Sequence, residues 1–187
     1  MSSKTLSENL LKHKEEIGDI EKFMLRFNPE IQKKLLKVGA GHVECMSYNY
    51  PTLEQSATIW GDEGIQLWIL VQLEDLNNFC GVKDKMTPAQ LKDLSAIILY
   101  QYGVMKISEF ALFLINFKSG KYGQFYGSVD PLIITNALNE FMTDRVVEFQ
   151  ISERKQEMLE NERKRAEWKK TAITYEQYKK EIEQENK

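Results

Sequence analysis

The sequence has very little cysteine: Cys45 and Cys80 are the two in 187 residues. A chain of this length can bury a hydrophobic core of its own and does not need disulfides to stabilise a small fold. We therefore expect both thiols to be reduced, and a disulfide-rich secreted domain is excluded. The length of 187 residues favours one domain, and the apolar content of 42% suits a soluble globular protein.

Long apolar runs are missing as well. The longest, residues 67–71 and 110–115, are far shorter than the roughly 20 apolar residues that cross a bilayer. The first eight residues turn polar and acidic before an apolar stretch forms, which is not typical of a secretory signal. We expect a cytoplasmic protein without a membrane partner.

One segment, Gly120-Lys121, resembles a phosphate-binding P-loop but lacks two of the residues that the motif needs. Gly120-Lys121 is followed by Tyr122, whereas the motif needs Ser or Thr there to reach magnesium. No glycine stands five residues before Gly120. Nucleotide hydrolysis is therefore not supported.

Metal and nucleophile signatures are equally sparse. His42 and Cys45 have the spacing of metal ligands, but a zinc site needs about four ligands, and the remaining candidates His13 and Cys80 are distant in sequence. Neither histidine lies in a recognisable catalytic motif. We expect no metal, no cofactor and no enzymatic activity.

Helical periodicity and end signals dominate the sequence, which predicts an all-α fold. Thr87-Pro88-Ala89-Gln90 has the pattern of a capping box, and Asp130-Pro131 repeats the cap-then-proline order. Asp62 and Glu109 are expected to act as helix caps in the same way. Glycine and proline mark residues 39–51 as a surface loop. The predicted helices cover residues 6–14, 20–27, 29–38, 52–60, 62–79, 88–102 and 107–118, and another starts at residue 131 and runs past residue 145.

The character of the chain changes near residue 150. Residues 152–187 carry ten basic and nine acidic side chains and few large apolar ones, which is typical of a solvated helix. We therefore predict a compact helical core over residues 1–150 and a charged helical arm over residues 151–187. A capping-box match at Thr174 predicts that the arm divides into two helices near residues 171–174.

The arm has two readings. It is a solvated helix, or it is a contact element in which Trp168, Tyr175 and Tyr178 face a partner or a second copy of the chain. The basic residues Arg163, Lys164 and Arg165 lie in the same segment and are predicted to contact nucleic acid or a partner.

The loop after residue 117 combines aromatic, basic and glycine residues, and it also has two readings. In one, the aromatic rings pack back onto the bundle and the lysines are solvated. In the other, bases of single-stranded nucleic acid stack on the rings while the lysines neutralise phosphates. A net charge of -3 means that any such contact needs a local patch of this kind. The residues concerned are Lys118, Lys121, Tyr122, Gln124, Phe125 and Tyr126.

A pattern of residues that includes this loop extends over roughly Glu74 to Arg145. It consists of Leu73-Glu74-Asp75-Leu76-Asn77, Lys85-Met86-Thr87, Tyr100, Ser108-Glu109, the segment Phe117-Lys118-Ser119-Gly120-Lys121-Tyr122-Gly123-Gln124-Phe125-Tyr126-Gly127, Asp130-Pro131, Phe141 and Arg145. In this pattern the chain resembles a family of small uncharacterised helical proteins of bacteriophages and mobile elements. The resemblance implies a non-enzymatic accessory protein, similar in style to replication accessory proteins such as helicase loaders.

Two hypotheses follow from the sequence. The first is an accessory protein of DNA replication, whose loop binds a replication enzyme or single-stranded nucleic acid. The second is an assembly module that binds a protein partner, or forms a homo-oligomer, through the arm.

Overall fold

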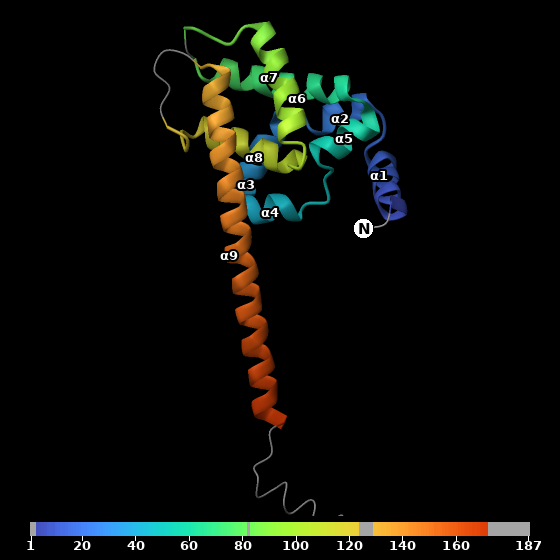
Figure 1. Cartoon of the computed structure of the whole chain (residues 1–187), viewed down its shortest axis with the longest axis vertical. Coiled ribbons are helices and arrows are strands. Elements are labelled where there is room, and N and C mark those ends of the chain that lie inside the picture. The colour runs from blue at the N-terminus through green and yellow to red at the C-terminus, as the bar shows by residue number, and fades with distance from the viewer. Residues whose placement is uncertain (1–2, 82, 124–128, 172–187) are drawn as a thin grey trace, which may run out of the picture. The chain divides into compact units, whose positions relative to one another are not determined.

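The computed structural model describes residues 3–81, 83–123 and 129–171 of the chain. These residues form helices and no β-strand, which confirms the all-α prediction. The chain divides into two compact units, Met1–Val146 and Val147–Lys187. The helices, labelled in Figure 1, are α1 (Ser3–Ile17), α2 (Ile20–Arg26), α3 (Glu30–Val38), α4 (His42–Ser47), α5 (Leu53–Trp60), α6 (Asp62–Phe79), α7 (Pro88–Gln101), α8 (Ile107–Lys118) and α9 (Pro131–Thr171).

Local hydrogen bonds set the starts of several helices. The Thr87 hydroxyl accepts from the Gln90 backbone N–H at 3.3 Å, and the Gln90 side chain accepts from the Thr87 N–H at 2.8 Å. At the start of α9, the Asp130 carboxylate accepts from the N–H groups of Leu132 and Ile133 at 2.8 and 3.0 Å. Both caps predicted from the sequence are therefore confirmed.

Two sequence predictions are wrong. Residues 39–51 were expected to be a loop, but they contain α4, which has only six residues and is too short to show a helical period. The Glu44 carboxylate caps this helix by accepting from the Gly41 N–H at 2.9 Å. Asp62 is not a cap but the first residue of α6, and its carboxylate accepts from the Tyr100 hydroxyl at 2.8 Å.

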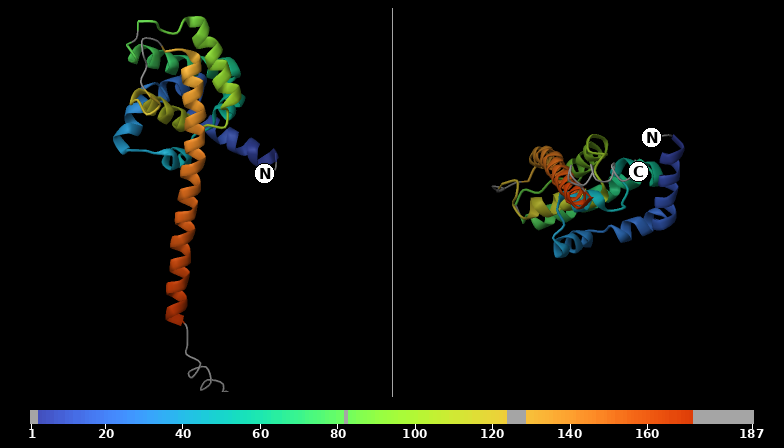
Figure 2. Two further views of the ribbon diagram at one scale, coloured as in Figure 1. Left: turned by 60° about the vertical axis from the view of Figure 1, so that its left-hand side comes forward. Right: turned by 90° about the horizontal axis from the view of Figure 1, so that it is seen from below.

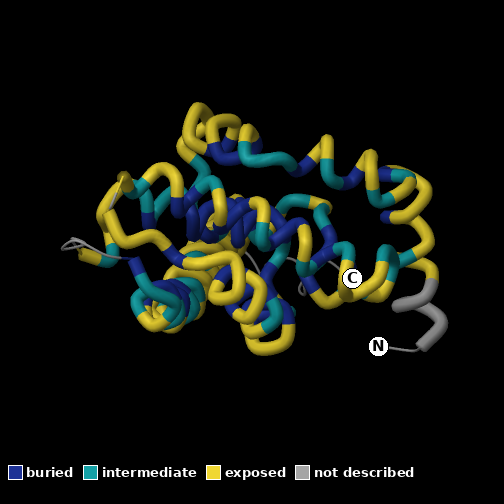
Figure 3. The backbone as a smooth tube through the Cα atoms, turned by 90° about the horizontal axis from the view of Figure 1, so that it is seen from above, coloured by how far each residue is buried: buried dark blue, intermediate teal, exposed yellow. Residues whose placement is uncertain are grey.

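Helix α8 forms the centre of the first unit. Nine of its twelve residues are buried, from Ile107 to Phe117. Figures 1 and 2 show α3 and α4 beside α8, and α6 packs against both α7 and α8. Figure 3 shows the buried stretches gathered inside this unit.

Aromatic side chains fill this core. The rings of Phe110, Phe113 and Phe117 follow one another along α8 with centroids 6.2 and 5.8 Å apart, and Trp68 of α6 meets Phe110 at 5.7 Å. All four side chains are at most 1% exposed. Each fully buried ring contributes about 1.5–3 kcal/mol of transfer free energy, so this cluster is a main source of stability.

Helix α9 continues from the first unit into the second. Its first turns bury Ile134, Ala137, Leu138 and Phe141, at the spacing of one helical face. From Val146 to Lys170 every residue except Ser152 is exposed. The second unit begins four residues before the arm predicted from the sequence, and from here on the arm means its described part, residues 147–171. The predicted division near residues 171–174 lies outside the described residues.

Candidate functional site

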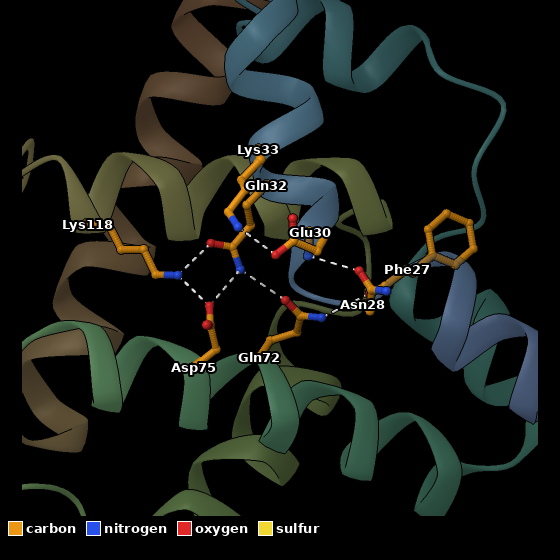
Figure 4. A network of polar contacts seen from close by, with 8 residues as sticks. All are labelled: Phe27, Asn28, Glu30, Gln32, Lys33, Gln72, Asp75 and Lys118. Carbon is orange, nitrogen blue, oxygen red and sulfur yellow. Dashed lines mark hydrogen bonds and ion pairs between the residues drawn. The ribbon is translucent and has the colours of Figure 1, made fainter.

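A network of polar side chains joins α3, α6 and α8 at the C-terminal end of α8 (Figure 4). The Lys118 ammonium donates to the Asp75 carboxylate and, at 2.8 Å, to the side-chain oxygen of Gln32. Gln32 donates in turn to the Gln72 amide oxygen at 3.1 Å, and Gln72 donates to the Phe27 carbonyl at 3.0 Å. Residues 40 or more positions apart in sequence are thus brought into one chain of hydrogen bonds.

The Lys118 ammonium has three close neighbours: Asp75, Gln32 and the ring of Phe79. Its side chain is 16% exposed, that of Asp75 is 38% exposed, and the Phe79 ring centroid lies 5.4 Å from the Lys118 nitrogen. The position at the last residue of α8 also favours a positive charge, because the carbonyl end of a helix carries a partial negative charge. The charge of Lys118 is therefore compensated inside the protein.

This arrangement bears on the predicted contact between Lys118 and phosphate. A phosphate at Lys118 would have to displace the Asp75 carboxylate, which already supplies the opposite charge. The structure thus gives Lys118 a different neighbour from the one that the sequence suggested.

A groove opens beside the network, with a volume of about 420 Å³. That volume falls within the range of roughly 300–1,000 Å³ seen for binding pockets. Two large apolar side chains on its rim, Leu36 and Phe79, are 67% and 60% exposed. We call it the Lys118 groove, and it is lined by Pro29, Glu30, Gln32, Lys33, Leu36, Asp75, Phe79, Ile115, Lys118 and Ser119.

The loop between α8 and α9 is called the glycine loop below. Its Tyr122 packs against the core. The Tyr122 ring stacks on Phe113 with centroids 5.8 Å apart, and it lies 6.4 Å from Phe117. Gly120 and Gly123 have φ angles of 79° and 101°, which side chains other than glycine rarely adopt. For Tyr122, this is the geometry expected if the aromatic rings of the loop pack back onto the bundle.

Lys121 also has a carboxylate neighbour. Its ammonium lies 2.8 Å from the carboxylate of Asp144 on α9, and the two side chains are 38% and 36% exposed. Solvent screens such a pair, so it is weaker than a buried one. The other predicted loop residues, Gln124, Phe125 and Tyr126, lie outside the described residues.

A third ion pair has one fully buried partner. Arg145 of α9 donates from its Nε to Glu109 Oε1 at 2.5 Å, and the Glu109 side chain is 0% exposed. Glu109 Oε2 also accepts from the Lys106 backbone N–H at 2.8 Å, which confirms its predicted cap role. No local pattern in the sequence indicates this ionic partner of Glu109, because Arg145 lies 36 positions away.

His42 and Cys45, which have metal-like spacing, both lie inside the core. The His42 ring meets Phe141 with centroids 4.4 Å apart. Burial, with smaller contributions from Glu109 and Glu44, raises the pKa of the Cys45 thiol to about 12. Within the described ranges, no three His, Cys, Asp or Glu side chains are grouped as metal ligands would be.

The predicted arm residues lie on the exposed part of α9. Arg163, Lys164 and Arg165 are all exposed, and Lys164 lies 2.7 Å from Glu160 on the same helix. Trp168 is 81% exposed. Tyr175 and Tyr178 lie outside the described residues, so Trp168 is the member of the predicted aromatic set that the structure describes.

None of the helices described here is both long and apolar enough to span a membrane.

Comparison with known proteins supplies a family but no activity. No curated protein and no solved structure matches the chain. A family model does match, over residues 85–187, which includes α7, α8, the glycine loop and α9. The match covers more than half of the sequence, and the chain therefore belongs to the family of unknown function DUF6633.

Proposed function

We propose that the protein is a non-catalytic interaction protein that binds a protein partner through the Lys118 groove. The observation that carries this proposal is the exposure of Leu36 and Phe79 beside a satisfied polar network. Exposed apolar side chains that rim a hollow are typical of surfaces that bury an apolar group of a partner. The Lys118 and Asp75 charges are paired with each other, so an uncharged segment fits there better than a phosphate.

A photo-cross-linking experiment tests this proposal. The photoreactive residue benzoylphenylalanine replaces Phe79 in the full chain, which is expressed in its natural host. The matched control carries it in place of Val104, which is 55% exposed and lies outside the groove. We expect a discrete protein adduct from position 79 and none from position 104. The same adducts from both positions, or none from either, would contradict the proposal.

The resemblance to proteins of bacteriophages and mobile elements supports a narrower role. It is that of an accessory protein of DNA replication that acts in the cytoplasm and whose partner is a replication protein. The identity of the adduct at position 79 tests this point directly. A partner unrelated to replication would leave the groove proposal standing and remove the replication role.

Single-stranded nucleic acid is the other partner class that the sequence suggested. Lys118 and Lys121 both have carboxylate neighbours, which weakens the case for the loop. The exposed basic residues of the arm remain, although Glu160, Glu162 and Glu167 lie among them. A salt-dependent mobility shift of labelled single-stranded DNA would support this class. The shift should be lost when Lys118, Lys121 and Tyr122 are changed to Ala, or when Arg163, Lys164 and Arg165 are.

A second binding surface is the arm itself, in which 24 residues from Val147 to Lys170 include one partly buried side chain, Ser152. Most of the stability of helices in proteins comes from packing one face against a neighbour rather than from intrinsic helix propensity. We therefore propose that the arm binds another helix. Truncation after Gln150 should abolish that association while the first unit stays folded, and a bound partner or an oligomer that persists after truncation would count against it.

A further inference from the structure

The arm carries a line of residues with the spacing of a coiled-coil seam. Positions 147, 151, 154, 158, 161, 165 and 168 alternate steps of four and three, which places them along one side of α9. Four of these positions are apolar: Val147, Ile151, Met158 and Trp168. Their exposed fractions are 49%, 59%, 65% and 81%.

Charged residues flank this seam on both sides with alternating sign. One side has Glu148, Lys155, Glu162 and Lys169, which follow one another at intervals of seven residues. The other side has Glu157 and then Lys164, also seven apart. In coiled coils these flanking positions choose the orientation and the register of the partner helix.

We propose that the arm pairs in antiparallel orientation with the arm of a second copy of this chain, with Ile151 of one copy opposite Trp168 of the other. The proposal rests on the second binding surface proposed above and names its occupant. In this register Met158 lies opposite Asn161 of the second copy. Because the pair is twofold symmetric, each contact occurs twice and the assembly closes at two copies.

The charges at the flanking positions favour this register. The register places Glu148 opposite Lys169 of the second copy, Lys155 opposite Glu162, and Glu157 opposite Lys164. All three contacts join opposite charges, which gives six attractive pairs in the symmetric dimer.

Other symmetric arrangements bring like charges together. A parallel pair in register places Glu157 beside Glu162 of the second copy and Lys164 beside Lys169. An antiparallel pair shifted by one heptad sets either Lys155 against Lys155 or Glu162 against Glu162. Like charges at such positions are unfavourable, so the sequence selects one register among these.

The same register has a cost that limits its strength. Arg154 of one copy faces Arg165 of the other, and Asn161 occupies a seam position. Arginine side chains in a seam can turn their charged ends toward solvent while their stems stay packed. A polar residue in a seam lowers stability but favours one register over its neighbours. We therefore expect a weak, reversible dimer that responds to salt.

Charge reversal at Lys155 and Glu162 tests the proposal in the full chain. These residues are seven positions apart and do not contact each other within one helix, since neighbours on a helix are three or four apart. Lys155→Glu or Glu162→Lys alone places like charges together twice and should weaken self-association by about tenfold. The double variant Lys155→Glu/Glu162→Lys restores opposite charges and should recover it. Glu153→Lys, which changes a charge outside the seam, is the matched control and should have little effect.

Sedimentation equilibrium over a range of protein and salt concentrations gives the result. A dimer that is weakened by each single change and rescued by the double change confirms the proposal. A parallel dimer is recognised because Glu162→Lys would strengthen it, through Glu157 of the second copy. That outcome, or a chain that stays monomeric up to about 1 mM, overturns the proposal. If the chain is monomeric but truncation after Gln150 still abolishes binding of another protein, the proposed function of the arm stands and the second copy as its occupant does not.

Discussion

The first unit and the arm contain parts of the same helix, α9, but they stabilise it in different ways. In the first unit α9 buries Phe141 and ties Arg145 to the buried Glu109. In the arm nearly every side chain is exposed, and the ion pair shown there joins Glu160 and Lys164, both more than 60% exposed. Packing against the core therefore stabilises α9 before Val146, whereas the stability of α9 after Val146 depends on local helix propensity and on what binds it.

Thiol labelling should show the largest difference between the two regions. The buried Cys45, whose pKa is raised to about 12, should react only when the first unit unfolds. A cysteine placed in the arm by Gln156→Cys should react orders of magnitude faster with a maleimide, and the half-buried Cys80 should fall between them. Rates followed by mass spectrometry give the order. If the arm cysteine reacted as slowly as Cys45, the contrast between the regions would fail.

Arginine replacements on both sides of the boundary sharpen the comparison. Arg145→Ala leaves the Glu109 charge buried without its partner and should lower the unfolding free energy by about 3–5 kcal/mol. Arg154→Ala, in the arm, should change it by less than about 0.5 kcal/mol. Urea unfolding monitored by tryptophan fluorescence measures both. Equal effects would show that the arm is as tightly packed as the first unit.

A smaller effect is expected at the groove. Lys118→Ala removes a charge-assisted hydrogen bond to Gln32 and the pair with Asp75, and should cost about 1–2 kcal/mol of unfolding free energy. Lys33→Ala, which breaks the exposed pair with Glu30, is the matched control and should leave the urea midpoint unchanged. A Lys118 variant as stable as the Lys33 variant would mean that the network is not a stabilising feature.

The smallest effect concerns pH. Burial lowers the pKa of His13, against an opposing contribution from Glu16. The unfolded chain then binds a proton near the ordinary pKa of 6.5, while the folded chain does so only at lower pH. Stability should be constant above that value and fall as the pH drops below it.

The urea midpoint at pH 7.5 and at pH 5.5 measures this loss, and His13→Gln should reduce it. Both histidines of the chain, His13 and His42, lie in the first unit, so removal of the arm should not alter the pH dependence. A midpoint that rose on acidification would contradict the assignment.

Local sequence signals predicted the parts of the fold that depend on neighbouring residues. The caps at Thr87 and Asp130 and the apolar helix at residues 107–118 were predicted because all their determinants lie within a few positions. Helix α4 was missed because six residues are less than two full turns, too few to display a period.

The candidate site was harder to predict. Lys118 was chosen as a functional residue, but its contact with Asp75 joins residues 43 positions apart, and nothing in their spacing indicates it. The same holds for Glu109 and Arg145. Such pairs follow from how α3, α6, α8 and α9 pack, which a local pattern does not contain. The opposite charges along the arm, in contrast, are readable from spacing once the helix is known.

Amide hydrogen exchange at two protein concentrations tests the central claim, that packing protects the first unit whereas association protects the arm. In the full chain, amides of α8 should exchange slowly at both concentrations, because they open only with the core. Amides of residues 147–171 should exchange quickly at low concentration and become protected at high concentration, as the arms pair. Arm amides as protected as those of α8 at low concentration would contradict the account.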